Sequence, residues 1–278
     1  MEDNPGQLYL VAVPIGNLED ITMRALRILR EADAIACEDT RQTTKLLELL
    51  GVSVPTLIST HEHNEGRRVS GLLERLAQGQ TIALVSDAGT PTVSDPGYTL
   101  VREAIKAGYQ PIPLPGPCAV ITALCASGLS TAQFRFLGFL PHKTGPLRKA
   151  FEEARHAKET IIYYVGPHHL EKALKLAHEV LGPSRHAVIA RELTKKFESF
   201  HRGTLHELVS DPGTVRGEMV LMLEAASGED KLAGAELDAL IVQLRQEGLA
   251  ASQIAKQVAR MGHLARAEAY RRVMDVLD

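Results

Sequence analysis

The amino-acid sequence predicts two α/β domains followed by a small helical appendage. Through residues 1–226, short apolar runs of strand type alternate with segments of helical spacing, which is the pattern of α/β proteins. The proline-rich run 111–117 interrupts this alternation, and residues 227–231 have the composition of a linker. The length of 278 residues also favours about two domains. We therefore expect domains at residues 1–117 and 118–226, and a helical tail at 232–278.

The first domain is expected to contain a mostly parallel sheet. Strand-type runs occupy residues 8–13, 34–37 and 81–85. Between them, apolar residues recur at helical spacing in residues 21–32 and 69–77. Strand, helix and strand in repetition indicate parallel strands joined by helices, so that the carboxyl ends of the strands share one edge.

The second domain is expected to be another α/β unit, reached through a hinge between the 111–117 run and about Ala132. Its strand-type runs are residues 135–140, 160–165, 187–191 and 219–224. A helical stripe at residues 170–181 is stopped by Gly182 and Pro183. The tail shows only helical stripes, split at Gly248 and Gly262 into three short helices that resemble a helix-turn-helix element.

Composition narrows the class of protein. A net charge of −3 excludes a uniformly basic nucleic-acid wrapper, and 4% aromatic residues with no Trp exclude a large base-stacking platform. The amino terminus is acidic and polar, and no uncharged apolar run is long enough for a membrane span. The three cysteines lie in apolar segments of the sequence and are expected to be buried, reduced thiols. These features favour a cytoplasmic protein.

Four loops at predicted strand ends are candidates for ligand contact. They are rich in Gly, Pro and small residues, which lets backbone groups approach a ligand closely, although such residues also build ordinary tight turns. Glu38, Asp39 and Asp87 add negative charge at this edge. The four loops are residues 13–20, 38–41, 86–97 and 115–119.

Other chemistries receive little support from the sequence. The Asp95-Pro96 pair is expected to be an N-cap followed by proline at the first helical position, so Asp95 is interpreted as structural. Glycine-rich nucleotide fingerprints and the G-x-S-x-G elbow are absent. His61 and His63, and the pair His168-His169, lack a third ligand at supportive spacing, so we expect no metal site.

Five motifs together resemble the ribosomal RNA small subunit methyltransferase I family, a branch of the tetrapyrrole (corrin/porphyrin) methylase fold. They are V-P-I-G-N-L-E-D-I-T, C-E-D-T-R, S-D-A-G-T-P-T-V-S-D-P-G, P-G-P-C-A and A-R-E-L-T-K-K. The resemblance covers essentially the whole chain, with one small departure at Cys118, where Ser is common. It implies 2′-O-methylation of a cytidine in the decoding region of 16S rRNA, with S-adenosylmethionine in a cleft between two α/β domains of a homodimer.

The resemblance also assigns site residues. Positions that match the family's cofactor contacts are Pro14, Ser86, Asp87, Ala88, Gly89, Thr90, Val93, Cys118, Ala119, Tyr164, Val165 and Met219. A ribose hydroxyl is a poor nucleophile, so a base or a stabilising cation is expected near it. Five charged residues at strand ends are candidates, each with an alternative role in a salt bridge between the domains: Glu38, Asp39, Arg191, Glu192 and Lys195.

RNA contact must come from local basic clusters, because the net charge is negative. One cluster surrounds a predicted helix start and contains Lys143, Arg148 and Lys149; a solvated basic loop is the alternative. The tail carries the other, with Lys256, Arg260, Arg266, Arg271 and Arg272 against Glu268. This cluster is expected to bind RNA phosphates or to pack in a dimer.

Two other functions fit parts of the sequence. A methylase of the same fold that acts on a tetrapyrrole or precorrin would need neither the basic loop nor the tail. A helix-turn-helix DNA-binding regulator would not need acidic strand-end loops beside a second domain. The methylation of rRNA is therefore the favoured reading.

Overall fold

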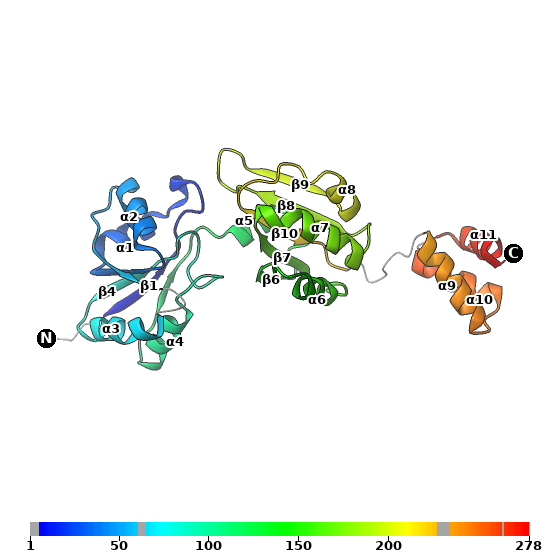
Figure 1. The fold of residues 1–278 in the computed structure, drawn as a ribbon. Helices are drawn as coiled ribbons and strands as arrows, with labels where there is room; N and C mark the ends of the chain where they lie inside the picture. The colour runs from blue at the N-terminus through cyan, green and yellow to red at the C-terminus, as the bar shows by residue number, and fades with distance from the viewer. Residues whose placement is uncertain (1–5, 61–64, 227–233, 263, 278) are drawn as a thin grey trace.

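The computed structural model describes residues 6–60, 65–226, 234–262 and 264–277. Figure 1 shows two α/β units followed by a separate group of helices, in chain order. This arrangement confirms the predicted fold class.

The first unit is built on a five-stranded, all-parallel sheet with the order β3-β2-β4-β1-β5. Its strands are β1 (Gln7–Val11), β2 (Ala34–Cys37), β3 (Thr56–Ser59), β4 (Thr81–Leu84) and β5 (Ile112–Leu114). The short 3₁₀ helix η1 (Leu18–Asp20) follows β1, and the helices are α1 (Met23–Glu31), α2 (Thr40–Leu49), α3 (Glu65–Ala77) and α4 (Tyr98–Lys106). Parallel pairing brings every strand's carboxyl end to one edge, as predicted.

Helices cover both faces of this sheet (Figure 1). Ile28 and Leu29 of α1 pack with Leu47 of α2 on one face, and Leu72 of α3 packs with Leu100 of α4 on the other. Because both faces are buried, the central strands β2 and β4 are largely apolar and buried, without alternation.

The second unit contains a mixed sheet with the order β6-β7-β10-β8-β9, in which only β6 and β7 are parallel. Its strands are β6 (Phe134–Phe139), β7 (Thr160–Val165), β8 (His186–Arg191), β9 (Ser199–Thr204) and β10 (Met219–Leu223). Its helices are α5 (Ala119–Ser127), α6 (Thr144–Ala154), α7 (Pro167–Leu181) and α8 (Leu205–Ser210). Helix α5 packs on one face through Val120 and Leu124, whereas α6, α7 and α8 cover the other. The chain therefore crosses between the sheets at residues 115–118.

The tail contains α9 (Ala235–Gln246), α10 (Ala251–Gly262) and α11 (Arg266–Leu277), which match the three expected helices. Leu237, Ile241, Ile254 and Val273 belong to a core cluster made of tail residues alone. Gly248, with a φ of +85°, terminates the turn after α9 as the pattern predicts.

One expectation, on the burial of the cysteines, needs adjustment. Cys37 is buried and Cys118 half-buried, but Cys125 is exposed on α5, so the prediction of three buried thiols is wrong for Cys125. The reason is that the outward face of α5 is also apolar, so the neighbouring residue types do not show which residues face the sheet. No helix in the described ranges is long and apolar enough to cross a membrane.

Candidate functional site

A cavity of about 290 Å³ is lined by residues of both α/β units. This volume is at the lower end of the roughly 300–1,000 Å³ typical of small-ligand sites. Ten of the twelve residues expected to contact the cofactor line it: Asp87, Ala88, Gly89, Thr90, Val93, Cys118, Ala119, Tyr164, Val165 and Met219. Pro14 and Ser86 do not line it and are buried beside it.

Hydrogen bonds fix the long loop after β4 against its neighbours. Val13 and Gly89 exchange backbone hydrogen bonds of 2.9 and 3.0 Å. The buried hydroxyl of Ser86 lies 3.1 Å from the Ala88 carbonyl, to which it donates, and Thr90 Oγ1 donates to the Pro117 carbonyl at 2.9 Å. Ser86 therefore shapes the loop from beneath, and Thr90 ties it to the crossover segment.

Backbone strain is concentrated in two loops at the cavity. Thr92, Ser94, Glu192 and Thr194 are the non-glycine residues of the described chain with positive φ, between +49° and +72°. The first two lie in the loop after β4 and the others in the loop after β8, and both loops contribute to the cavity lining. Such conformations cost of order 1–3 kcal/mol each and persist only where surrounding contacts impose them. The two loops are therefore held in defined shapes.

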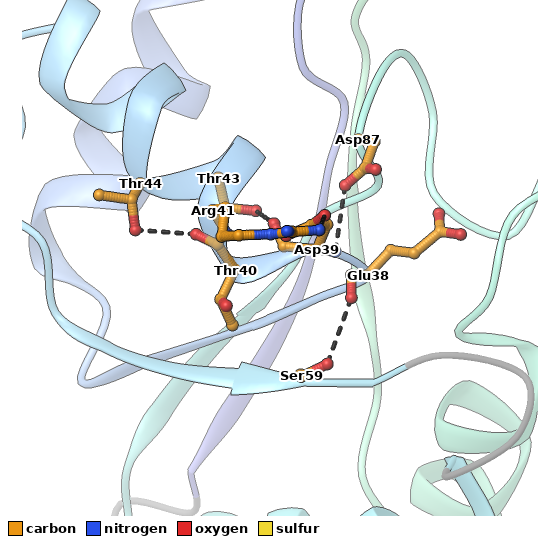
Figure 2. Close-up of polar contacts among 8 residues, drawn as sticks. All are labelled: Glu38, Asp39, Thr40, Arg41, Thr43, Thr44, Ser59 and Asp87. Carbon is orange, nitrogen blue, oxygen red and sulfur yellow. Dashed lines mark hydrogen bonds and ion pairs between the residues drawn. The ribbon is translucent and has the colours of Figure 1, made fainter.

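Asp39 caps a helix and does not face the cavity. Its carboxylate accepts the Arg41 backbone N–H at 2.9 Å and forms an ion pair of 2.7 Å with the Arg41 guanidinium (Figure 2). These contacts lower the pKa of Asp39 to about 2. The Asp39 N–H donates to Asp87 Oδ1 at 3.2 Å, which links two strand-end loops. Glu38, whose carbonyl accepts from Ser59 Oγ, is likewise absent from the cavity lining.

Two of the candidates, Glu192 and Lys195 in the loop after β8, form a polar cluster with Glu218 at the cavity edge. Lys195 Nζ donates to Glu192 Oε1 at 2.9 Å and to Glu218 Oε2 at 2.8 Å, and Glu218 itself lines the cavity. The pKa of Lys195 is raised, because these two hydrogen bonds outweigh its partial burial, and Lys195 lowers the pKa of Glu192. Lys195 is therefore a cation at neutral pH.

Arg191 holds loops together. Its Nε donates to the Arg216 carbonyl at 2.7 Å and its Nη1 to the Phe197 carbonyl at 2.9 Å. None of the five charged candidates is itself among the residues that line the cavity. The structure thus brings Glu192 and Lys195 together with Glu218, which the sequence did not single out, and keeps Asp39 apart.

The prediction that Asp95 is a helix N-cap is wrong. Helix α4 is capped by Gly97, with a φ of +118°, so Asp95 is two residues too early to be the N-cap. Asp95 instead lines the cavity. Burial, reinforced by the negative charges of Glu38 and Asp87, raises its pKa to about 7. The only signal in the sequence was its place inside the S-D-A-G-T-P-T-V-S-D-P-G motif.

The basic clusters are partly paired. Arg148 forms a 2.8 Å ion pair with Glu179, and Lys149 lies 3.9 Å from Glu153. Lys143 occupies the N-cap of α6, where no side chain caps the helix. In the tail, Arg266 and Arg271 are exposed, whereas Arg272 is bound to Asp238 at 2.8 Å.

The structure gives no three-ligand metal group in the part of the chain that it describes. His61 and His63 lie outside the described residues. His169 contacts His142.

The chain resembles known methyltransferases over most of its length. Residues 7–209 match the family model described as Tetrapyrrole (Corrin/Porphyrin) Methylases. A protein of Halalkalibacterium halodurans named "Ribosomal RNA small subunit methyltransferase I" is 52% identical over 80% of this chain and 77% of its own. A protein of Mesorhizobium japonicum with the same name is 44% identical over 98% of this chain and 92% of its own.

Solved structures share the fold at lower identity. The methyltransferase CobJ matches with a TM-score of 0.59 and 21% identity, over 80% of this chain and 95% of its own. A uroporphyrin III C-methyl transferase from Thermus thermophilus matches with a TM-score of 0.56 and 19% identity, over 79% and 97% of the two chains. At these identities the likeness concerns the fold alone.

Proposed function

We propose that this chain, which belongs to the tetrapyrrole methylase family and to its ribosomal RNA small subunit methyltransferase I group, methylates small-subunit ribosomal RNA. The single observation that carries the proposal is 44% identity to a relative of that name over 98% of the chain, tail included. The helical tail with its basic cluster favours RNA over a small tetrapyrrole, because a small substrate would not need it.

The cofactor of this reaction is S-adenosylmethionine, which supplies an activated methyl group when bound. The cavity fits its mixed chemistry, since Val165, Met219 and Leu193 offer an apolar slot while Asp87 places a carboxylate in the same lining. Gly89 adds a close backbone approach: its φ is +78°, and a Cβ there would lie 3.2 Å from Ile15. In this proposal Asp87, Ala88, Gly89, Thr90 and Val93 hold the methionine part and the ribose.

The acceptor is the 2′-hydroxyl of a cytidine in the decoding region of 16S rRNA, and the enzyme works in the cytoplasm as a homodimer. These details follow from the family resemblance. Methyl transfer is an in-line displacement, so holding the acceptor oxygen about 3 Å from the methyl carbon supplies much of the acceleration. A hydroxyl also needs help to lose its proton, and carboxylates in the cavity lining are suited to that task.

The test is methyl transfer from labelled S-adenosylmethionine to 30S subunits, naked 16S rRNA and a tetrapyrrole substrate, side by side. Mass spectrometry of the digested RNA is expected to place the methyl group on the ribose of one cytidine. A transcript with a single 2′-deoxy substitution at that cytidine is expected to bind but to remain unmethylated. Transfer to the tetrapyrrole alone, or a methyl group on a base, would refute the proposal.

The cofactor site has its own test. Asp87→Ala is expected to weaken S-adenosylmethionine binding by about 10-fold or more in calorimetry, because a hydrogen bond to a charged group contributes about 1.5–3 kcal/mol. Glu74→Gln, on the exposed side of α3, is the matched control. Unchanged affinity in Asp87→Ala would remove the loop after β4 from the cofactor site.

A further inference from the structure

We propose that Asp95 is the group that accepts the proton of the acceptor hydroxyl during methyl transfer. The inference rests on the proposed function, since it needs an oxygen nucleophile. It concerns a residue that sequence reasoning had assigned to a helix cap.

The position of Asp95 carries the proposal. Asp95 lines the cavity together with Asp87 of the same loop and with Phe139 and Tyr164 of the second sheet. Ser94, with a φ of +67°, and Gly97, with a φ of +118°, flank it, so the backbone fixes the direction of this segment. Both conformations are costly or restrictive, and they keep the carboxyl group at the cavity instead of at the start of α4.

The charges around Asp95 leave it without a cationic partner. The groups that act on it are Glu38, at the end of β2, and Asp87, after β4. Across the cavity, Asp95 acts on Tyr164 of β7, on which Cys118 of α5 and Glu218, before β10, also act. Lys195, at the cavity edge, is bound to Glu192 and Glu218. Within the described ranges, Asp95 has no ion pair of its own.

These surroundings give Asp95 the properties of a proton acceptor at neutral pH. Burial and the neighbouring carboxylates raise its pKa to about 7. A general base is most effective when its pKa lies near the working pH, because it is then both ionised and basic enough to take a proton. An ordinary aspartate would be ionised but too weakly basic.

The other charged residues are less suited to this role. Asp39 is committed to the cap of α2, and its pKa is about 2. Lys195 stays protonated, because its hydrogen bonds to two carboxylates raise its pKa. Burial raises the pKa of Tyr164 well above its usual range, so its hydroxyl is neutral. Asp87 receives the Asp39 N–H and is assigned above to the cofactor.

The step balances in atoms and charge. The O–H bond of the acceptor breaks, and its proton passes to the Asp95 carboxylate. The oxygen lone pair forms the new O–C bond to the methyl carbon while the C–S bond breaks, which leaves its electron pair on sulfur as a neutral thioether. The protonated Asp95 then returns its proton to water.

The experiment compares the wild-type chain with Asp95→Asn, Asp95→Glu and the control Glu74→Gln, and first requires that the wild type methylates the RNA. For Asp95→Asn, kcat is expected to fall by about 10²-fold or more, the usual contribution of a general base. The Kd for S-adenosylmethionine is expected to stay within about threefold, because the cofactor is held elsewhere. Asp95→Glu, which keeps a carboxyl group, is expected to have a kcat between those of Asp95→Asn and the wild type. The control Glu74→Gln is expected to have the wild-type kcat.

The pH profile separates a base from a merely structural residue. In the wild type, kcat/KM for the cofactor is expected to rise with pH to a plateau with a midpoint near 7, the pKa of Asp95 before the cofactor binds. In Asp95→Asn the residual kcat/KM is expected not to rise with pH in this range. In Asp95→Glu a rise with pH is expected to remain. A rise with pH that survives in Asp95→Asn, an unchanged kcat, or a Kd that rises as much as kcat falls would each overturn the proposal. A wild type that methylates no RNA would instead refute the proposed function.

Discussion

Lys195 of the second domain lies against Gly16 of the first, so closely that a Cβ at Gly16 would overlap the Lys195 Cγ. The same lysine binds Glu192 and the cavity residue Glu218. One side chain therefore joins the loop after β1, the loop after β8 and the start of β10. The absence of a side chain at residue 16 is what lets the two domains approach here.

Gly16→Ala is expected to displace Lys195 and to lower kcat/KM, because the ion pairs that position Glu218 are then disturbed. In a Lys195→Ala background the same substitution is expected to cost much less, since the shorter side chain leaves room for the added methyl group. The coupling energy between contacting residues is typically about 0.5–3 kcal/mol, which corresponds to roughly 2- to 150-fold in kcat/KM. Steady-state kinetics of the four proteins measure it. Additive effects would mean that the two residues do not cooperate.

The stability of the protein is expected to depend on pH through Asp95. Its pKa is about 7 in the folded chain against 3.8 ordinarily, so between those values the folded state binds more protons than the unfolded state. Stability contributed by the protonated form is therefore lost as pH rises from about 4 to 7. Asp95→Asn, which is neutral at every pH, should melt at a higher temperature than the wild type above pH 7.

Melting temperatures measured across that range provide the check. The difference between Asp95→Asn and the wild type is expected to grow with pH and then to level off once Asp95 is ionised in both states. Glu74→Gln, whose carboxyl group is exposed, should run parallel to the wild type. A difference that is constant with pH would show that Asp95 is ionised normally in the folded chain.

Much of the fold could be predicted because buried parallel strands are recognisable. All four residues of the run A-I-A-C at β2 are buried. Its continuous apolar residues therefore identify it as a buried strand. The strand β9, S-F-H-R-G-T, was missed, since it is a half-exposed edge strand without regular alternation. Its place depends on pairing with β8, which no local pattern encodes.

The lining of the cavity could be predicted where one motif carries it. Asp87, Gly89 and Thr90 belong to a single loop, and all three line the cavity. Asp95 was wrongly predicted to be an N-cap because Asp-Pro is a common helix start. In the structure α4 begins two residues later, after the left-handed Gly97. The bond between Lys195 and Glu218 spans 23 residues and arises only because β8 pairs with β10.

The basic residues at the start of α6 are expected to contribute RNA affinity. Reversal of Lys143, Arg148 and Lys149 to Glu should weaken binding and flatten its salt dependence, because each lost phosphate contact removes about 0.7–0.9 from the slope of log K against log salt. Lys158→Glu, an exposed lysine beyond the other end of α6, is the control. Filter binding over a range of salt concentrations measures both quantities. A normal slope would assign this cluster to the solvated surface.

The tail arginines are expected to separate into two roles. Arg266 and Arg271 are exposed, so their joint reversal to Glu should weaken RNA binding while the tail stays folded. Arg272 instead binds Asp238 and the Gly234 carbonyl at 2.8 Å each, and it thereby joins α11 to the start of α9. Arg272→Ala should destabilise the tail by about 1 kcal/mol, the upper range for a partly exposed pair, and hydrogen exchange in α9–α11 should accelerate about fivefold. If the Arg266 and Arg271 reversal left RNA binding intact and changed the oligomeric state in sedimentation, the tail would be a dimer contact instead of an RNA contact.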